Sequence, residues 1–338
     1  MPAHPHVSVV IPAFDVAATL PETLKSVLAQ SFADLEAIVV DDGSRDATPE
    51  IVRACRDPRV RLVRQANRGL AGARNTGIFE SRGRLVAFLD GDDLWRRDKL
   101  AAHVRHMHRR PDLGLSFSAS AMIDARGREL GLVQRGRLVG IDAAHVIRRN
   151  PIGNGSAPVM RREALDDIAH RPDPDDRPHW FDESFRQSED IECWLRLALT
   201  TSWRIEGLAE ALTLYRVNPG GLSADGAAQL ESWERMIAKA AGYAPDFTGR
   251  HAAPARAYQL RYLARRAVSA RDGAQALRLL RDALVESREP LWSEASRSVA
   301  TLGAAAVLGL AGRHAYAAAE SAALTLLRAV SRRGPALP

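Results

Sequence analysis

Acidic residues gather in one short stretch of the chain. Asp90 and Asp92 flank Gly91, and Asp93 follows directly. Carboxylates this close repel one another unless a cation lies between them. Hard oxygen ligands suit Mg²⁺ or Mn²⁺, which also bind substrate phosphates. The stretch therefore predicts a divalent metal site or, alternatively, an N-terminal cap for a helix starting at Leu94.

Two further segments offer groups for a nucleotide. Asp41 and Asp42 lie in a polar turn, where a carboxylate can accept a hydrogen bond from a nucleoside base. The same turn fits an Asx-type cap for the following helix. Phe14 can stack on the base or belong to the core. Arg74 lies in a Gly- and Ala-rich lead into a helix and can bind an anion.

A second acidic pair opens a predicted helix. Glu189 and Asp190 precede an amphipathic pattern that extends to Leu199. Acidic residues in a first turn commonly compensate the helix dipole. The same field keeps Asp190 ionised, which a general base requires. The residues alone leave both interpretations open.

The elements that position these residues alternate between strand and helix. Short, unalternating apolar runs predict strands buried on both faces, at Val7–Ile11, Leu35–Val40, Val60–Val63 and Leu85–Leu89. Helical spacing predicts helices at 17–30, from an N-cap at Thr48, and at 70–80. This alternation indicates a parallel α/β sheet, whose ligands lie at the carboxyl ends of the strands. Three of these ends carry the polar or aromatic residues described above.

The composition changes near residue 225. We expect a catalytic domain over 1–224 and a basic helical extension over 225–338, rich in Ala, Leu and Arg. Its predicted helices are 227–242, 254–271, 273–287, 291–311 and 314–332. From Arg250 onward there are 14 arginines, no lysine and six acidic residues, a charge of +8 within a chain of +6.

A basic helical extension favours an anionic partner, either a membrane or a polyanion. A solvated helix face, packing on the catalytic domain and a dimer surface remain alternatives. No nucleic-acid partner is expected. The apolar run Val299–Ala311 is too short to span a bilayer, which predicts a buried or interfacial helix.

The remaining signals concern location. Cys55 and Cys193 lie far apart and match no metal spacing, which predicts reduced thiols in a reducing cytosol. The N-terminus lacks a basic region followed by an apolar stretch, so no secretion signal is expected. We therefore expect a cytoplasmic protein, peripheral on the inner membrane face where its helices bind lipid.

Taken together, the motifs resemble glycosyltransferase family 2 over residues 7–223, in the order of that family. The matching segments are Val7–Phe14, Asp41–Thr48, Gly69–Gly77, Leu89–Asp93, Phe181–Phe185, Glu189–Asp190 with Trp194–Leu197, and Tyr215–Ser223. Two departures are Phe14, where the family usually has Tyr, and Asn218, where it often has His. The resemblance implies an α/β, GT-A type fold: a mixed, mainly parallel sheet flanked by helices, with an all-α C-terminal extension.

The resemblance also implies a metal-dependent, inverting hexosyltransferase. It would move a sugar from a nucleotide diphosphate donor, with UDP expected, to an acceptor hydroxyl in cell-surface polysaccharide or glycolipid synthesis. Asp190 would be the catalytic base, and Asp90 and Asp92 would hold Mn²⁺ or Mg²⁺. The implied donor-binding residues are Pro12, Phe14, Asp41, Asp42, Arg74, Asp90, Gly91 and Arg216. The implied acceptor-side residues are Trp180, Glu189 and Asn154, facing a sugar or a lipid-linked acceptor.

Two other classes of protein fit less well. A non-catalytic nucleotide-sugar-binding or membrane-docking scaffold on the same fold would not need both the Asp90–Asp92 pair and Asp190. A sugar-phosphate nucleotidyltransferase carries a Gly-rich basic loop after its first strand, where this chain has Pro12–Asp15.

Overall fold

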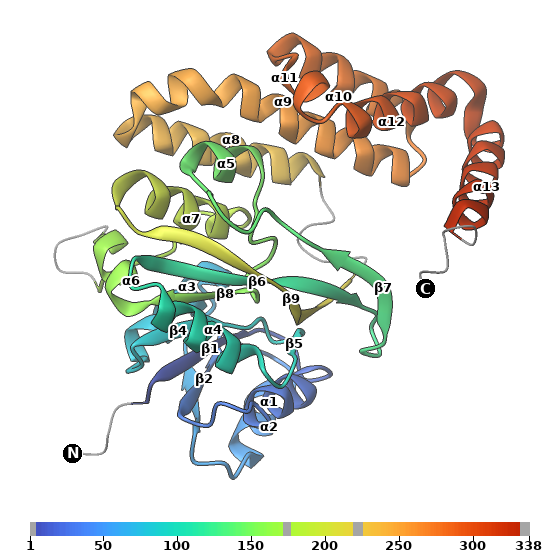
Figure 1. Ribbon diagram of the computed structural model, residues 1–338. Helices are drawn as coiled ribbons and strands as arrows, with labels where there is room; N and C mark the ends of the chain where they lie inside the picture. The colour runs from blue at the N-terminus through green and yellow to red at the C-terminus, as the bar shows by residue number, and fades with distance from the viewer. Residues whose placement is uncertain (1–4, 172–176, 219–225, 332–338) are drawn as a thin grey trace, which may run out of the picture. The chain divides into compact units, whose positions relative to one another are not determined.

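The computed structural model describes residues 5–171, 177–218 and 226–331. The chain divides into two compact units, Met1–Ala244 and Pro245–Pro338. The first unit holds a central sheet with helices around it, and the second is entirely helical in its described part (Figure 1).

The sheet of the first unit has the strand order β3-β2-β1-β4-β8-β6-β9-β5, with β7 paired to β6. The strands are β1 (Val7–Ala13), β2 (Leu35–Asp41), β3 (Val60–Arg64), β4 (Leu85–Phe88), β5 (Leu94–Trp95), β6 (Leu113–Ile123), β7 (Glu129–Gln134), β8 (Pro158–Arg161) and β9 (Arg204–Arg216). Strands β1 to β4 pair in parallel, as do β6 and β9, whereas β8 runs antiparallel between β4 and β6. The sheet is therefore mixed, with a parallel half at its N-terminal side.

The helices of the first unit are α1 (Leu20–Leu28), α2 (Thr48–Ala54), α3 (Gly69–Glu80), α4 (Lys99–Arg109), α5 (Ala143–Arg148), α6 (Arg162–Ile168), α7 (Glu189–Thr200) and α8 (Gly226–Tyr243). All residues of β1 and β2 are buried, because successive side chains point to opposite faces and both faces are covered. Val9 packs in the core cluster with α1 and α4, whereas Ile38 packs with Ala73 of α3 on the other side. Gly77 lets α3 approach closely, since a Cβ there would lie 2.2 Å from Val10.

The predicted strands and helices of the parallel half are confirmed, with two corrections. Helix α2 starts after Ala47 rather than after a Thr48 cap, and Thr48 donates its backbone N–H to Asp46 Oδ1 at 2.9 Å. Leu94 belongs to strand β5, which pairs with β9, so no helix starts there. The helix-cap interpretation of the acidic stretch was therefore wrong.

The boundary expected between 224 and 225 falls outside the described residues, as do Pro219–Ser223 of the closing segment. Helix α8, expected in the extension, belongs to the first unit. Lys239 explains why, since its Nζ lies 2.7 Å from Asp182 Oδ2 and 2.9 Å from Glu192 Oε1. Glu192 is almost fully buried, so this pairing ties α8 to α7.

We expect Lys239→Ala to lower the free energy of unfolding by about 1–3 kcal/mol, because it removes a partner from two carboxylates. Burial alone would raise the pKa of Asp182, but hydrogen bonds from Lys239 and Ser184 outweigh it and lower the pKa to about 2. This stabilisation is therefore present above the ordinary value of 3.8 and is lost as the pH falls towards 2. Urea titrations of both proteins at several pH values measure the effect.

Lys25→Ala is the matched control, because Lys25 is exposed on α1 and makes no ion pair within the described residues. It should change the free energy of unfolding by less than about 0.5 kcal/mol. An equal loss in both variants would remove the assigned role of Lys239.

The second unit consists of α9 (Pro245–Ser269), α10 (Gly273–Glu286), α11 (Glu289–Ser293), α12 (Ala295–Ala306), the π-helical turn η2 (Val307–Ala311) and α13 (Gly312–Ser331). The predicted hairpin around Asp272 is confirmed: Asp272 caps α10 by accepting from Gln275 N–H at 2.9 Å. The hydrophobic core cluster of the second unit includes Val268, Ala276 and Ala305.

Helices α12, η2 and α13 follow one another without a loop, so the apolar segment is longer than the run seen in the sequence. Ala295–Ser321 is long and apolar enough to cross a membrane by length and composition. That match is not by itself evidence of a span. Gly312 also interrupts the helical path with φ 85° and ψ 175°.

Candidate active site

Three separate segments of the chain meet around one buried arginine. Arg74, on α3, is 2% exposed. Its Nη2 donates to Asp90 Oδ1 at 2.9 Å, and its Nη1 donates to Glu189 Oε1 at 2.7 Å. The guanidinium also lies 5.4 Å from the centre of the Phe181 ring. The acidic stretch after β4 and the first turn of α7 are thereby held together.

Burial alone would lower the pKa of Arg74, but the charges of Asp90, Glu189 and Asp190 outweigh it and raise the pKa. The positive charge of Arg74 thus interacts favourably with three carboxylates. From the sequence, Arg74 was predicted to bind an anion. The anions it binds here are side chains of the protein itself.

Gly155 makes room for this arrangement. A Cβ at that position would lie 2.0 Å from Arg74 Nη2 and 3.2 Å from Asp90 Oδ2. We expect Gly155→Ala to displace the guanidinium and to reduce turnover by about 100-fold, the scale expected for a 1 Å misplacement at a reacting centre. Gly131→Ala, with nothing within 4 Å of the added Cβ, is a control for general tolerance to glycine replacement. Because Gly131 has a φ of 70°, the alanine variant should have backbone strain but no steric clash. Unchanged turnover in Gly155→Ala would show that Arg74 need not hold this position.

The three acidic residues after β4 have different surroundings. Asp93 is buried and accepts from the Ser156 hydroxyl at 2.6 Å and from the Arg216 backbone N–H at 2.8 Å. Burial and the charges of Asp92 and Asp90 raise its pKa well above the ordinary value. Asp93 therefore shapes the turn and does not face a ligand.

Asp90 and Asp92 are more open. Asp92 is partly exposed, and Asn218 Nδ2 donates to its Oδ2 at 2.7 Å. Burial and the neighbouring Asp90 charge raise the pKa of Asp92 to about 6. One oxygen of each carboxylate, Asp90 Oδ2 and Asp92 Oδ1, bonds to no other residue in the part of the chain that the structure describes.

Arg216 was predicted to bind the donor, and the structure gives it another role. Its side chain is 2% exposed. Nε donates to the Asp92 carbonyl at 2.7 Å, Nη1 to the Ala125 carbonyl at 2.8 Å, and Nη2 to Glu22 Oε2 at 3.1 Å. The guanidinium therefore holds the acidic turn in this structure, and donor binding by Arg216 stays a prediction.

The first turn of α7 carries the second acidic pair. Glu189 is 5% exposed, and burial raises its pKa to about 7 despite the Arg74 partner. Asp190 is partly exposed. Burial raises its pKa too, against the attraction of Arg74. Its Oδ1 accepts from Ile191 N–H at 2.7 Å, and the charge of Asp90 acts on it, so the two acidic segments interact.

The predicted nucleoside-binding residues lie at the ends of β1 and β2. Phe14 is 42% exposed, which leaves its ring open for stacking. Asp41 is buried, accepts from Ser44 N–H at 2.9 Å and pairs with Arg64 Nε at 2.8 Å. Asp42 caps α3 by accepting from Gly69 N–H at 2.8 Å. Both carboxylates thus organise the turn itself.

Gly91 and Pro12 connect the nucleoside end to the acidic turn. A Cβ on Gly91 would lie 3.2 Å from the Pro12 carbonyl and 2.9 Å from Val16. The Gly91 carbonyl accepts from the Thr19 hydroxyl at 2.9 Å. Only a glycine allows the acidic turn to lie this close to the end of β1.

Two predicted acceptor-side residues are interior. Trp180 is 4% exposed, so it offers no face for stacking in this structure. Asn154 is 6% exposed and donates to the Ser120 hydroxyl at 2.9 Å, while its Oδ1 accepts from Ser156 N–H at 3.1 Å. Both side chains are therefore buried beneath the site in this structure.

Two supporting residues lie in segments that the sequence had indicated, but neither was assigned the role that the structure gives it. Asn75 accepts from Phe181 N–H at 2.8 Å and donates to the Phe181 carbonyl at 2.8 Å, which positions the segment before α7. Ser156 links Asp93 to the backbone N–H of Asp90, which lies 3.0 Å from its hydroxyl. The turn of small polar residues at 154–156 was the available signal for Ser156. For Asn75 the sequence signal was its position next to Arg74.

The site carries more carboxyl groups than cations. Asp90, Asp92, Asp93, Glu189 and Asp190 lie around Arg74 and Arg216, and the pKa values of Asp92, Asp93, Glu189 and Asp190 are raised. Among the described residues, no three His, Cys, Asp or Glu side chains form a group able to hold a metal ion. Mg²⁺ and Mn²⁺ commonly take one or two carboxylates and complete their coordination with phosphates and water. The free oxygens of Asp90 and Asp92 fit that requirement.

Comparison with known proteins defines the class. A profile described as Glycosyl transferase family 2 matches residues 8–168. The succinoglycan biosynthesis protein ExoO of Rhizobium meliloti (strain 1021) is 33% identical over 232 residues, covering 65% of this chain and 63% of that protein. The putative teichuronic acid biosynthesis glycosyltransferase TuaG of Bacillus subtilis (strain 168) is 30% identical over 225 residues, covering 65% of this chain and 82% of that protein. The chain belongs to glycosyltransferase family 2. It spans less than two thirds of ExoO, and as little as 26% of other curated glycosyltransferases that it matches.

Two solved structures show the same fold. Residues 1–349 of TarS from S. aureus, in complex with UDP-GlcNAc, are 17% identical with a TM-score of 0.55, over 89% of this chain and 81% of that chain. The mannosyltransferase PcManGT from Pyrobaculum calidifontis, in complex with GDP-Man and Mn²⁺, is 21% identical with a TM-score of 0.54, over 92% and 89%. These likenesses establish the fold alone, and the expected GT-A type fold with a helical C-terminal part is confirmed.

Proposed function

We propose that this protein transfers a sugar from a nucleotide diphosphate donor to an acceptor hydroxyl, with inversion, using a divalent metal ion. One observation carries the proposal. Arg74 joins Asp90 to Glu189, so the open pair Asp90 and Asp92 lies in one charged cluster with Asp190. Relatives named for succinoglycan and teichuronic acid synthesis, and fold neighbours bound to nucleotide sugars, support this class of reaction.

Each end of the donor has candidate contacts in this chain. The exposed ring of Phe14 stacks on the base, above the turn that Asp41 and Asp42 organise. Asp90 and Asp92 would hold Mn²⁺ or Mg²⁺, which would supply positive charge to the departing diphosphate. We expect UDP as the nucleotide, in line with the UDP-GlcNAc bound to TarS, and the GDP-Man bound to PcManGT makes GDP the second candidate.

Asp190 is the proposed general base. It is partly exposed at the start of α7, so an acceptor hydroxyl can reach it. It takes the hydroxyl proton as that oxygen attacks the anomeric carbon on the face opposite to the diphosphate. A single displacement of this kind inverts the anomeric configuration. Burial raises the pKa of Asp190, which makes its carboxylate a stronger base for the proton of the acceptor hydroxyl.

We propose that the acceptor is a sugar or a lipid-linked sugar in surface polysaccharide or glycolipid synthesis, since the named relatives act in such pathways. A cytoplasmic location fits the two cysteines, which are free thiols. Glu189 stays a positioning residue in this proposal, because its carboxylate is engaged by Arg74.

A thermal-shift screen of nucleotide sugars with and without Mn²⁺ tests the proposal. We expect the correct donor to raise the melting temperature only when Mn²⁺ is present, and EDTA to abolish both the shift and turnover. Asp92→Asn should weaken this metal-dependent shift, because it removes one of the two ligand carboxylates. Equal stabilisation without metal would contradict metal dependence. Binding of UDP without turnover of any donor would favour a non-catalytic scaffold instead.

A further inference from the structure

Helix α12 of the second unit is amphipathic in the reverse of the usual sense. Its buried side chains include the polar or small residues Ser298, Thr301 and Ala305. Val299 is 67% exposed and Leu302 is 44% exposed. A helix on a water-soluble domain normally turns its apolar stripe towards the core. The outer face of α12 is therefore built for surroundings other than water.

The same property extends along the chain on both sides of α12. All large hydrophobic side chains that are exposed in the described part of the second unit lie within 284–310: Leu284, Val285, Trp292, Val299, Leu302, Val307 and Leu310. We call this stretch the apolar segment. Trp292 is 73% exposed and Leu310 is 84% exposed. The most apolar window of the candidate span that overlaps it is only 22% buried.

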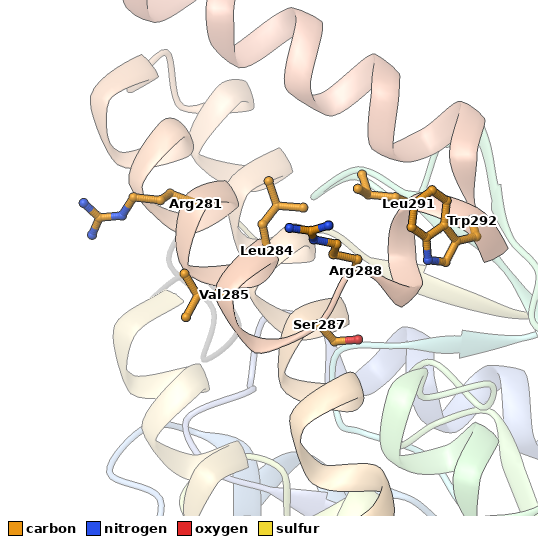
Figure 2. A pocket seen from close by; sticks show the side chains of 7 residues that line it. All are labelled: Arg281, Leu284, Val285, Ser287, Arg288, Leu291 and Trp292. Carbon is orange, nitrogen blue, oxygen red and sulfur yellow. The ribbon is translucent and has the colours of Figure 1, made fainter.

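A surface hollow opens where α10 ends and α11 begins (Figure 2). Leu284 and Val285 line one side of it, Leu291 and Trp292 line the other, and Arg288 extends between them. Arg288 is exposed, and its side chain makes no hydrogen bond or ion pair within the residues described. Arg281, also lining the hollow, has a side chain that is 75% exposed and pairs with its neighbour Asp282 alone in the described part of the chain.

The acidic residues of the apolar segment do not balance these arginines. Glu286 pairs with Arg256, and Glu294 pairs with Arg261 and Arg297. Glu289 lies 3.5 Å from the Tyr258 hydroxyl. The acidic side chains are thus engaged by helix α9 or by their neighbours, whereas Arg288 is left for an external anion.

We propose that the apolar segment docks on the surface of an anionic phospholipid bilayer, with Trp292 and its apolar neighbours in the interface and Arg288 and Arg281 at the lipid phosphates. Indole rings favour the boundary between lipid headgroups and acyl chains, and arginines beside an apolar face favour anionic lipid. A soluble polyanion offers no apolar surface against which the exposed valines and leucines could be buried. A second copy of the chain, packed about a two-fold axis on this hollow, would bring the same arginines together. Their positive charges would repel one another, which disfavours a dimer at this surface.

The proposal concerns where the protein binds and does not depend on the transfer reaction. Flotation of the full chain with vesicles tests it, comparing phosphatidylglycerol-containing vesicles with phosphatidylcholine alone. We expect wild type to float with the anionic vesicles, and added salt to weaken this binding. Trp292→Ser should reduce the vesicle-bound to free ratio about tenfold, because it removes a large apolar side chain from the interface. Arg288→Gln should reduce it about fivefold on anionic vesicles and leave binding to neutral vesicles unchanged.

Leu132→Ser is the matched control, because Leu132 is 64% exposed on β7 of the first unit. It should leave flotation unchanged. All three positions are exposed, so folding should persist, and circular dichroism checks this. The proposal is overturned if wild type fails to float, or if Trp292→Ser and Leu132→Ser behave alike. It is equally overturned if sedimentation shows a dimer that Trp292→Ser dissociates while no vesicle binds.

Discussion

Asp190→Asn should retain donor binding and lose about 10²–10⁴-fold in turnover, the usual contribution of a general base. Asn keeps the shape of the side chain and can still accept from Ile191 N–H, as Asp190 does at 2.7 Å. It cannot take a proton from the acceptor. Calorimetric titration with UDP and Mn²⁺ measures donor affinity, and single-turnover kinetics with the donor identified by thermal shift measure the chemical step.

Glu163→Gln is the control for removing an acidic residue from the same unit, because Glu163 is exposed on α6. Its turnover should equal that of wild type. A loss of donor affinity as large as the loss of turnover in Asp190→Asn would reject the role of base. Such a result would make Asp190 part of the donor site.

Arg74→Ala should lower the free energy of unfolding by about 3–5 kcal/mol, the usual cost of leaving one partner of a buried ion pair alone. Glu189 is 5% exposed and would lose the guanidinium that lies 2.7 Å away. Asp90 would lose its partner at 2.9 Å. Chemical denaturation measures the loss, and turnover should fall with it because the two acidic segments are no longer joined.

Two variants separate this effect from a general loss of charge. Arg53→Ala removes an exposed arginine that lies 2.9 Å from Glu50, and should cost less than about 1 kcal/mol. Arg74→Ala combined with Glu189→Ala should cost less than the sum of the single variants, since no buried Glu189 carboxylate is then left without its partner. Strict additivity would show that the Arg74–Glu189 pair contributes no coupling.

The order of elements in the parallel half was predictable, because a strand buried on both faces requires an unalternating apolar run. Val7–Ile11 and Leu35–Val40 have that pattern, and they form most of β1 and β2. The C-terminal helical hairpin was predictable from helical spacing around Asp272. The position of α8 was not, because its attachment to the first unit depends on Lys239 meeting carboxylates more than 40 residues away.

The candidate site was predictable in residue type but not in use. Arg74 and Arg216 have the chemistry of phosphate ligands, yet one binds two carboxylates and the other binds backbone carbonyls and Glu22. Trp180 has the chemistry of a sugar platform, yet it is interior. The partners of both arginines come from other segments of the chain, and no local sequence pattern predicts them.

The sequence by itself determined that Asp41, Asp42, Asp90 and Asp92 follow buried strands, because apolar runs and polar strand ends are local properties of the chain. Membership of the family follows from the same linear order of motifs. Only the tertiary structure decided which polar groups remain open. Asp90 and Asp92 each keep a free oxygen while Asp93 does not, because Ser156 and Arg216 reach Asp93 from segments more than 60 residues away.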